Sequence, residues 1–291
     1  MAAIECVLNC QAELAESPVW DPEEGVLYWV NIKGREIHRY DPANGKDHAW
    51  KTPADVGSLA LRRGGGMVVA LKTGFFFFDP ASSRFTPIVE PEADLADNRF
   101  NDGKTDRQGR FWAGSLHDPD ETRPSGALYR LDPDLSCHRM VDGIYASNGL
   151  AFSPDSRTAY YADSRRRIVW AWDFDQDTGM LRNRRVFVAL GEREGVPDGA
   201  AVDEEGGYWL AQPPAARVVR YDPHGRRDRV LDLPVSQPTS VAFGGARLDT
   251  LYISSARYRM PADRLLNEPL AGGIFAIFPG ITGVPDARFG G

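Results

Sequence analysis

A unit of about 40 to 50 residues recurs along the chain, and this internal repeat limits the possible fold more than any other feature of the sequence. Each copy opens with a polar residue and a short apolar stretch, and continues through a turn rich in Asp, Pro and Gly. A strand with aromatic residues follows, as in residues 26–30, 110–113, 158–162, 207–210 and 250–253. A repeat of this length is typical of a β-propeller, in which each unit forms one four-stranded blade.

Counting by this template gives about six units, which differ in their opening residue. Oxygen-bearing side chains open four of them, namely Glu16, Asn101, Asn148 and Asp198. The other two units begin at Val56 and Thr239. Because a blade can open with Val56, the repeat itself does not require a polar residue there. A purely architectural explanation of the four oxygen-bearing residues is therefore weakened.

The predicted strands are short, rich in β-branched and aromatic residues, and separated by turn residues, as expected of antiparallel sheets. Helical periodicity is nearly absent. Residues 4–14 resemble a strand before the first unit, and the last unit ends in the apolar segment 273–278. We expect the N-terminal strand to join the last blade, because this pairing would close the ring and remove its free edges. The sequence thus predicts an all-β, six-bladed β-propeller that forms a single domain over residues 1–291.

The net charge of -7 and the lack of a long basic run argue against a nucleic-acid partner. Arg165, Arg166 and Arg167 lie between strand-like segments, where a solvated hairpin tip is the favoured interpretation, and we assign them no function. No segment approaches the roughly twenty apolar residues that span a bilayer. The first ten residues lack a basic leader and a sustained apolar stretch, so we expect no secretory signal and a cytoplasmic location.

Cysteine and histidine do not indicate a zinc or disulfide site. The three cysteines, Cys6, Cys10 and Cys137, match neither a zinc ribbon nor a redox pair, and the five histidines show no paired zinc-ligand spacing. His117 follows the aromatic strand of the unit that opens at Asn101, so a pocket-facing role and a structural role are both considered.

Equivalent positions of repeats arranged around an axis converge on that axis. The four oxygen-bearing openings would therefore form one cluster, although they are far apart in the sequence. Hard oxygen donors gathered at one point describe a divalent-cation site. They suit Ca²⁺, Mg²⁺ or Mn²⁺, and Zn²⁺ and Fe²⁺ also accept carboxylates, so the identity of the metal stays open.

The blade openings resemble those of the SMP-30/gluconolactonase/regucalcin-like family over essentially the whole chain. The resemblance lies in Ala15-Glu-Ser-Pro-Val-Trp20, Arg99-Phe-Asn-Asp-Gly-Lys104, Ser147-Asn-Gly-Leu-Ala-Phe152 and Pro197-Asp-Gly-Ala-Ala-Val-Asp203. It implies one divalent metal ion in the central channel of a six-bladed propeller. By motif, the metal ligands would be Glu16, Asn148 and Asp198.

The same resemblance implies that Arg99 and Asn101 hydrogen-bond the substrate. Asp102 belongs to the same motif, either as a further substrate contact or as a turn residue that organises the loop through its backbone. The family's variable loop corresponds to residues 117–124, which align too poorly for substrate contacts to be assigned.

The expected function is metal-dependent hydrolysis of a sugar lactone, an aldonolactone, to the aldonic acid. The cation would polarise the lactone carbonyl, and Asp198 would be the general base. We expect a small-molecule substrate and a monomer. Two alternatives stay open: another ester or organophosphate hydrolase on the same scaffold, and a non-catalytic calcium-binding propeller.

Overall fold

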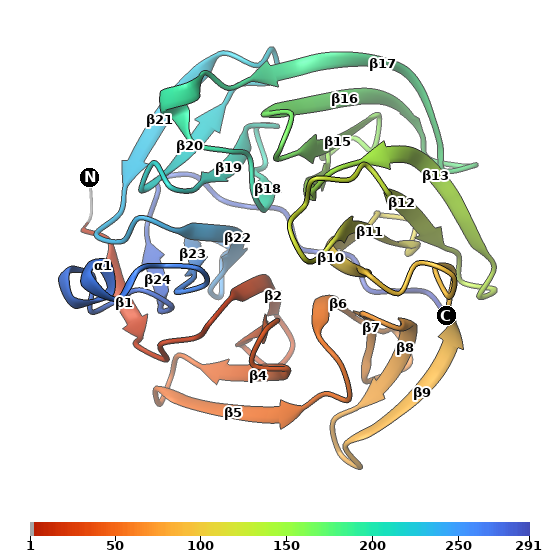
Figure 1. The fold of residues 1–291 in the computed structure, drawn as a ribbon, viewed down its shortest axis with the longest axis horizontal. Coiled ribbons are helices and arrows are strands. Elements are labelled where there is room, and N and C mark those ends of the chain that lie inside the picture. The colour runs from red at the N-terminus through yellow and green to blue at the C-terminus, as the bar shows by residue number, and fades with distance from the viewer. Residues whose placement is uncertain (1–2) are drawn as a thin grey trace.

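The structure is a computed structural model that describes residues 3–291. It contains six four-stranded sheets arranged as blades around a central axis (Figure 1). All neighbouring strands within a blade run antiparallel; for example, β2 pairs with β3 and β3 with β4. The predicted six-bladed propeller is confirmed.

The strands of each blade follow one another outward from the axis. The innermost strands are β2 (Ala15–Asp21), β6 (Val56–Leu61), β10 (Asn98–Thr105), β14 (Ser147–Phe152), β18 (Ala200–Val202) and β22 (Pro238–Gly244). The second strands are β3 (Val26–Asn31), β7 (Met67–Leu71), β11 (Phe111–His117), β15 (Thr158–Asp163), β19 (Tyr208–Gln212) and β23 (Thr250–Ser255).

The third and outermost strands complete the blades, which we number 1 to 6 in the order of their innermost strands. The third strands are β4 (Glu36–Asp41), β8 (Gly74–Asp79), β12 (Gly126–Leu131), β16 (Ile168–Asp175), β20 (Arg217–Tyr221) and β24 (Ile274–Ile277). The outermost strands are β5 (Lys46–Lys51), β9 (Arg84–Val89), β13 (Cys137–Ile144), β17 (Met180–Ala189), β21 (Arg227–Asp232) and β1 (Glu5–Leu8).

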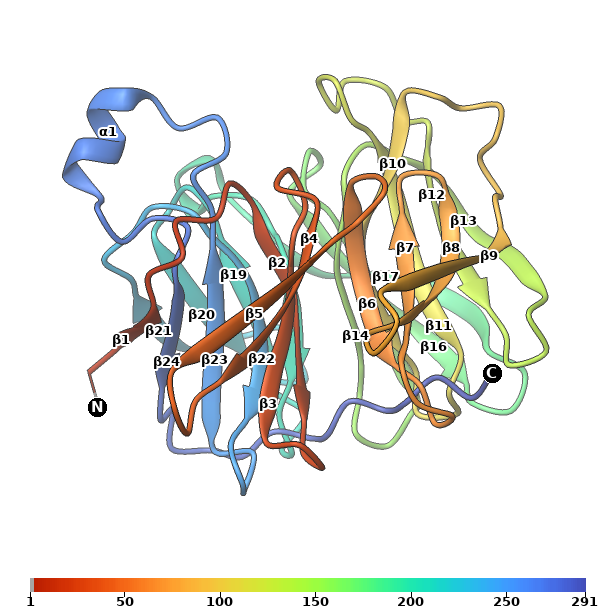
Figure 2. The ribbon, with the colours of Figure 1, turned by 90° about the horizontal axis from the view of Figure 1, so that it is seen from below.

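Strand β1 closes the ring by pairing with β24 of blade 6, as the sequence predicts. Within the described residues, helical structure is confined to the short helix α1 (Ala262–Asn267), at the edge of one face (Figure 2), and the 3₁₀ turn Glu192–Glu194. In residues 3–291 we find no helix with the length and apolar character needed to cross a membrane.

The hydrophobic core lies between neighbouring blades. Trp20 and Trp29 of blade 1, for instance, share one buried cluster with Tyr252 and Ile274 of blade 6. Another cluster joins Trp209 of blade 5 to side chains of blade 6. Because each blade buries its faces against both neighbours, the ring fixes where every innermost strand meets the axis.

An Asp or a Ser stands five residues after each oxygen-bearing opening: Asp21, Asp106, Ser153 and Asp203. This residue shapes the turn that follows. Asp106 Oδ1 accepts the backbone N–H of Gln108 at 3.0 Å, and its Oδ2 accepts Trp112 Nε1 at 2.9 Å. Asp203 accepts the N–H of Gly207 at 2.8 Å and Trp209 Nε1 at 2.7 Å. This second polar position of the repeat is therefore architectural and does not belong to the cluster at the axis.

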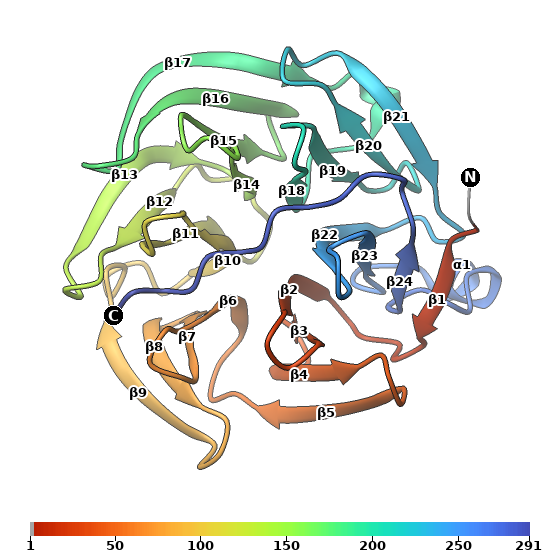
Figure 3. The ribbon, with the colours of Figure 1, turned by 180° about the vertical axis from the view of Figure 1, so that it is seen from behind.

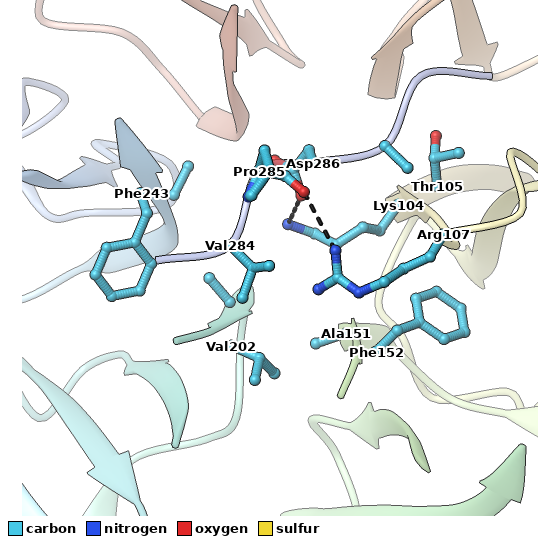
Figure 4. Close-up of a pocket in the computed structure, with 13 residues that line it drawn as sticks. Lys104, Thr105, Arg107, Ala151, Phe152, Val202, Phe243, Val284, Pro285 and Asp286 are labelled. Atoms are coloured by element: carbon cyan, nitrogen blue, oxygen red, sulfur yellow. Dashed lines mark hydrogen bonds and ion pairs between the residues drawn. The ribbon is translucent and has the colours of Figure 1, made fainter. Parts of the chain in front are cut away.

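Residues 279–291 cross one face of the propeller (Figure 3). The buried Phe289 donates its N–H to the carbonyl of Leu61 at 2.8 Å. Near the axis, Lys104 Nζ lies 3.3 Å from Asp286 Oδ1, and Arg107 Nη1 donates to the Pro285 carbonyl at 3.3 Å (Figure 4). This segment covers the axis on that face.

Candidate metal and substrate site

Five of the residues predicted from the sequence line one cavity of about 150 Å³. They are Glu16 on β2, Arg99 and Asn101 on β10, Asn148 on β14, and Asp198 just before β18. The wall also includes apolar side chains and the polar residues Glu121, Ser164, Gln237, Thr239 and Tyr258. The structure thus brings together residues from four blades, as expected for equivalent positions around an axis.

The innermost strands bulge where they carry these side chains. The register of β2 against β3 shifts between Glu16 and Val19, and that of β14 against β15 shifts between Asn148 and Ala151. A bulge re-aims a side chain and increases the local twist. Gly149 lies in the β14 bulge at a φ of 61°, where an added Cβ would stand 2.5 Å from the Tyr208 hydroxyl, so the bulge requires glycine there.

A directed chain of hydrogen bonds fixes the two asparagines. Arg99 Nη1 donates to Asn101 Oδ1 at 2.6 Å, and Asn101 Nδ2 donates to Asn148 Oδ1 at 2.9 Å. Asn148 Nδ2 donates to Ser164 Oγ at 2.8 Å. Because the amide nitrogen of Asn148 is occupied by Ser164, its carbonyl oxygen is turned towards Asn101 and has a second lone pair free for a cation.

Asp118 anchors the other end of this chain. It accepts Arg99 Nε at 2.6 Å and lies 2.8 Å from Lys33 Nζ, and these two cations lower the pKa of Asp118 against the opposing effect of burial. Two of the three guanidinium nitrogens of Arg99 are thus engaged with protein. We find no hydrogen bond from Arg99 Nη2 to any residue in 3–291, so this nitrogen can serve a ligand.

Glu16 and Asp198 form a pair of interacting acids. Burial, together with the charge of Asp102, raises the pKa of Glu16 to about 8. Burial and the neighbouring Glu16 raise the pKa of Asp198 well above its ordinary range. Two ionised carboxylates in this setting are unfavourable unless a cation lies beside them.

The donor set fits a hard divalent cation. It offers the carboxylate oxygens of Glu16 and Asp198 and the amide oxygen of Asn148, with no sulfur or imidazole. Across residues 3–291, no group of three or more His, Cys, Asp or Glu side chains is arranged to hold a metal ion. An ion at this site would therefore need the asparagine oxygen in addition to the two acids.

Asp102 does not line this cavity. Its Oδ2 accepts the backbone N–H of Leu150 at 2.8 Å, and burial raises its pKa to about 6. It lines a smaller cavity with Lys104 and Asp286 towards the face that residues 279–291 cover. Asp102 lies within β10 and its hydrogen bond ties that strand to β14 of the next blade, so it is not the turn residue of the alternative interpretation, and a contact with the substrate stays a prediction.

His117 and the loop that follows it lie beside the site. His117 Nδ1 lies 2.8 Å from Asp120 Oδ1, and its Nε2 is buried without a hydrogen-bond partner in the part of the chain that the structure describes. His117 does not line the cavity, whereas Glu121 of the same loop does.

Sequence reasoning did not identify Asp118, Ser164 or Glu121. Asp118 and Ser164 directly follow the second strands β11 and β15 of their blades. The repeat itself could have drawn attention to this position, because the loops after neighbouring second strands lie on the same face of a propeller.

Comparisons with known proteins show which family this chain belongs to. The family described as SMP-30/Gluconolactonase/LRE-like region matches residues 14–257. Regucalcin of Gallus gallus is 40% identical over 99% of this chain and 98% of its own length. The 6-deoxy-6-sulfogluconolactonase of Pseudomonas putida is 38% identical over 99% of both chains.

Among solved structures, a calcium-binding protein, regucalcin, from Agrobacterium tumefaciens superposes with a TM-score of 0.94. It is 28% identical, and the match covers 99% of this chain and 97% of that one. With a family match over most of its length and full-length relatives above 30% identity, the chain belongs to the SMP-30/gluconolactonase/LRE-like family.

Proposed function

We propose that this protein hydrolyses a sugar lactone to the corresponding aldonic acid with the help of one divalent metal ion. One observation carries the proposal. The side chains of Glu16, Asn148 and Asp198 line one cavity together with Arg99, whose Nη2 has no hydrogen-bond partner within residues 3–291. The name of the Pseudomonas putida relative, a lactonase, supports the same chemistry.

Glu16, Asn148 and Asp198 would hold the metal. When bound, the ion would supply Lewis-acid polarisation of the lactone carbonyl and a lowered pKa for water. Arg99 Nη2 and Asn101 would orient the substrate by hydrogen bonds, an effect of positioning and not of proton transfer.

Asp198 would act as the general base. Its carboxylate removes a proton from the attacking water as the water oxygen bonds to the carbonyl carbon. The ring C–O bond then breaks, and the proton held by Asp198 passes to the leaving ring oxygen, which becomes a hydroxyl. One water is consumed, and no oxidant or reductant is needed.

The first test is a proton-release assay over a panel of aldonolactones, with phosphotriesters and aryl esters as competing substrates. We expect the lactones to rank first, activity to disappear with chelator, and one or more divalent metals to restore it. If lactones ranked last, the family scaffold would serve a different ester in this protein.

Asp198→Asn, assayed at saturating metal because Asp198 is also a proposed ligand, tests the general base. Because the amide cannot accept the proton of water, we expect kcat to fall by about 10² to 10⁴. Circular dichroism should show the same fold, and the exposed Asp177→Asn is a matched control that should keep full activity. Undiminished lactone hydrolysis by Asp198→Asn would remove this residue from the mechanism.

A non-catalytic calcium-binding propeller is the second candidate, since the Agrobacterium tumefaciens relative is described as a calcium-binding protein. Tight calcium binding without turnover of any lactone, aryl ester or phosphotriester would favour it.

A further inference from the structure

A second, open pocket adjoins the candidate site. It has a volume of about 500 Å³ and is lined by Glu121, Thr122, Tyr145, Arg165 and Arg166. Glu121 belongs to the walls of both cavities. Ser164, the residue before the two arginines, lines the first cavity and binds Asn148. The two pockets therefore share Glu121 as a common wall.

The two arginines lie at the exposed hairpin tip between β15 and β16 that the sequence predicts, and their guanidinium groups also contact the protein. Arg165 Nη2 donates to the Asp120 carbonyl at 2.9 Å, and its Nε lies 3.1 Å from Glu121 Oε2. Arg166 Nη1 donates to the Gly143 carbonyl at 2.8 Å and to Asp163. The Arg166 guanidinium also lies over the Tyr145 ring, 4.7 Å from its centroid.

These anchors leave donors unused. Among residues 3–291 we find no hydrogen-bond partner for Arg165 Nη1, Arg166 Nη2 or the Tyr145 hydroxyl. A pre-positioned guanidinium with free N–H groups is suited to bind an oxyanion, because little rotamer freedom is lost when it binds.

The local charge is also favourable. Glu121 is the one acid lining this pocket, and its carboxylate is shared between Arg165 and Arg259, whose Nη1 lies 3.7 Å from Oε1. Asp163 is buried and pairs with Arg166. The lining of this pocket thus carries two guanidinium groups and one carboxylate, in a chain whose net charge is -7.

We propose that this pocket is a subsite for an anionic substituent carried by the lactone, a sulfonate, phosphate or carboxylate group on a carbon distant from the reacting carbonyl. The inference rests on the proposed lactonase function and adds a substrate class to it. Arg165, Arg166 and the Tyr145 hydroxyl would bind the anionic group while the lactone carbonyl lies in the first cavity.

The test compares a neutral aldonolactone with matched lactones that carry a sulfonate, a phosphate or a carboxylate at the far end. We expect the wild-type protein to prefer at least one anionic lactone in kcat/KM. In Arg165→Gln/Arg166→Gln, KM for that lactone should rise about tenfold or more, because charge-assisted hydrogen bonds are lost. The KM for the neutral lactone and both kcat values should be unchanged, as should all constants of the control Arg182→Gln on β17.

Three outcomes would overturn the subsite: no preference for any anionic lactone, an equal rise in KM for neutral and anionic lactones, or a loss confined to kcat. An equal rise would mean that Arg165 and Arg166 serve only to hold the loop at Glu121. If the protein hydrolysed no lactone, the proposed function would fail instead. Calorimetry of neutral and anionic lactones with the wild-type protein and with Arg165→Gln/Arg166→Gln would then test the subsite by affinity alone.

Discussion

Ser164 links two of the three proposed metal ligands. Its Oγ accepts Asn148 Nδ2 at 2.8 Å and donates to the Pro197 carbonyl at 2.7 Å. The hydroxyl thereby ties strand β14 of blade 4 to the residue before Asp198, the ligand from blade 5. A side chain that orients ligands in this way acts on metal affinity without touching the metal.

We expect Ser164→Ala to weaken metal binding about tenfold or more, because Asn148 and the segment before Asp198 lose their common partner. Ser164→Thr keeps the hydroxyl and should restore most of the affinity. Titration calorimetry of the metal checks both variants, and kcat at saturating metal should change less than the metal affinity. Equal metal affinity in wild type and Ser164→Ala would show that the contact is only structural.

The residues of the site differ in how far the sequence could predict them. The sequence could predict Glu16, Asn148 and Asp198 because they occupy the same position of the repeat. The structure gathers them in one cavity. Ser164 and Asp118 act through hydrogen bonds to those residues or to Arg99, and such partners have no motif of their own. Arg165 and Arg166 lie at the exposed tip that the sequence predicts, but their hydrogen bonds to carbonyls 45 and 23 residues away could not be predicted from it.

At the scale of elements, the closure of the ring depends on β24, which lies between β23 and β1. Its Phe275 is fully buried in the cluster shared by blades 5 and 6, whereas Phe278, just after the strand, is 60% exposed. Phe275 and Phe278 are thus a matched pair for mutation: the same residue type, one in the core and one in solvent.

We expect Phe275→Ala to lower the free energy of unfolding by about 3 to 5 kcal/mol, through lost burial and the cavity left behind. Phe278→Ala should change it by no more than about 0.5 kcal/mol, since an exposed side chain loses little contact. Chemical denaturation of both variants measures the difference. Similar losses for the two would mean that β24 does not anchor the ring.

Most strands could be predicted from the sequence because strand and turn patterns recur with each repeat. Alternating strands and recurring turns predict the blades, and the apolar segments at the two ends of the chain predict the pairing of β1 with β24. Residues 279–291 were not predicted, because the segment crosses the propeller without regular structure. Some of its contacts, such as the Phe289 N–H to the Leu61 carbonyl, involve backbone groups that any sequence supplies, and others, such as Lys104 with Asp286, join residues far apart in the sequence.

At the scale of the whole molecule, the proposed metal would join three blades at the axis. Glu16 comes from blade 1, Asn148 from blade 4 and Asp198 from the loop that enters blade 5. Binding to the folded ring alone would stabilise it by about 2.7 kcal/mol when the metal concentration is one hundred times its Kd.

The acids of the site set the pH dependence of this stabilisation. The folded pKa of Glu16, about 8, lies above its ordinary value of 4.5, so its protonated form is favoured in the folded protein. A carboxyl with a raised pKa contributes stability that is fully present below pH 4.5 and is lost as pH rises through 8. The raised pKa of Asp198 acts in the same direction.

For the chelator-treated protein, we therefore expect Tm to fall as pH rises from about 5 to 8. Saturating divalent metal should remove most of this fall, because the cation favours both ionised carboxylates, and the increase in Tm on adding metal should grow with pH. Calorimetric scans with chelator and with metal measure both trends, and Glu16→Gln provides the control, since it cannot ionise and should show a smaller dependence. A Tm in chelator that rises between pH 5 and 8, or metal stabilisation that is the same at both ends, would contradict the placement of Glu16 and Asp198 around one cation.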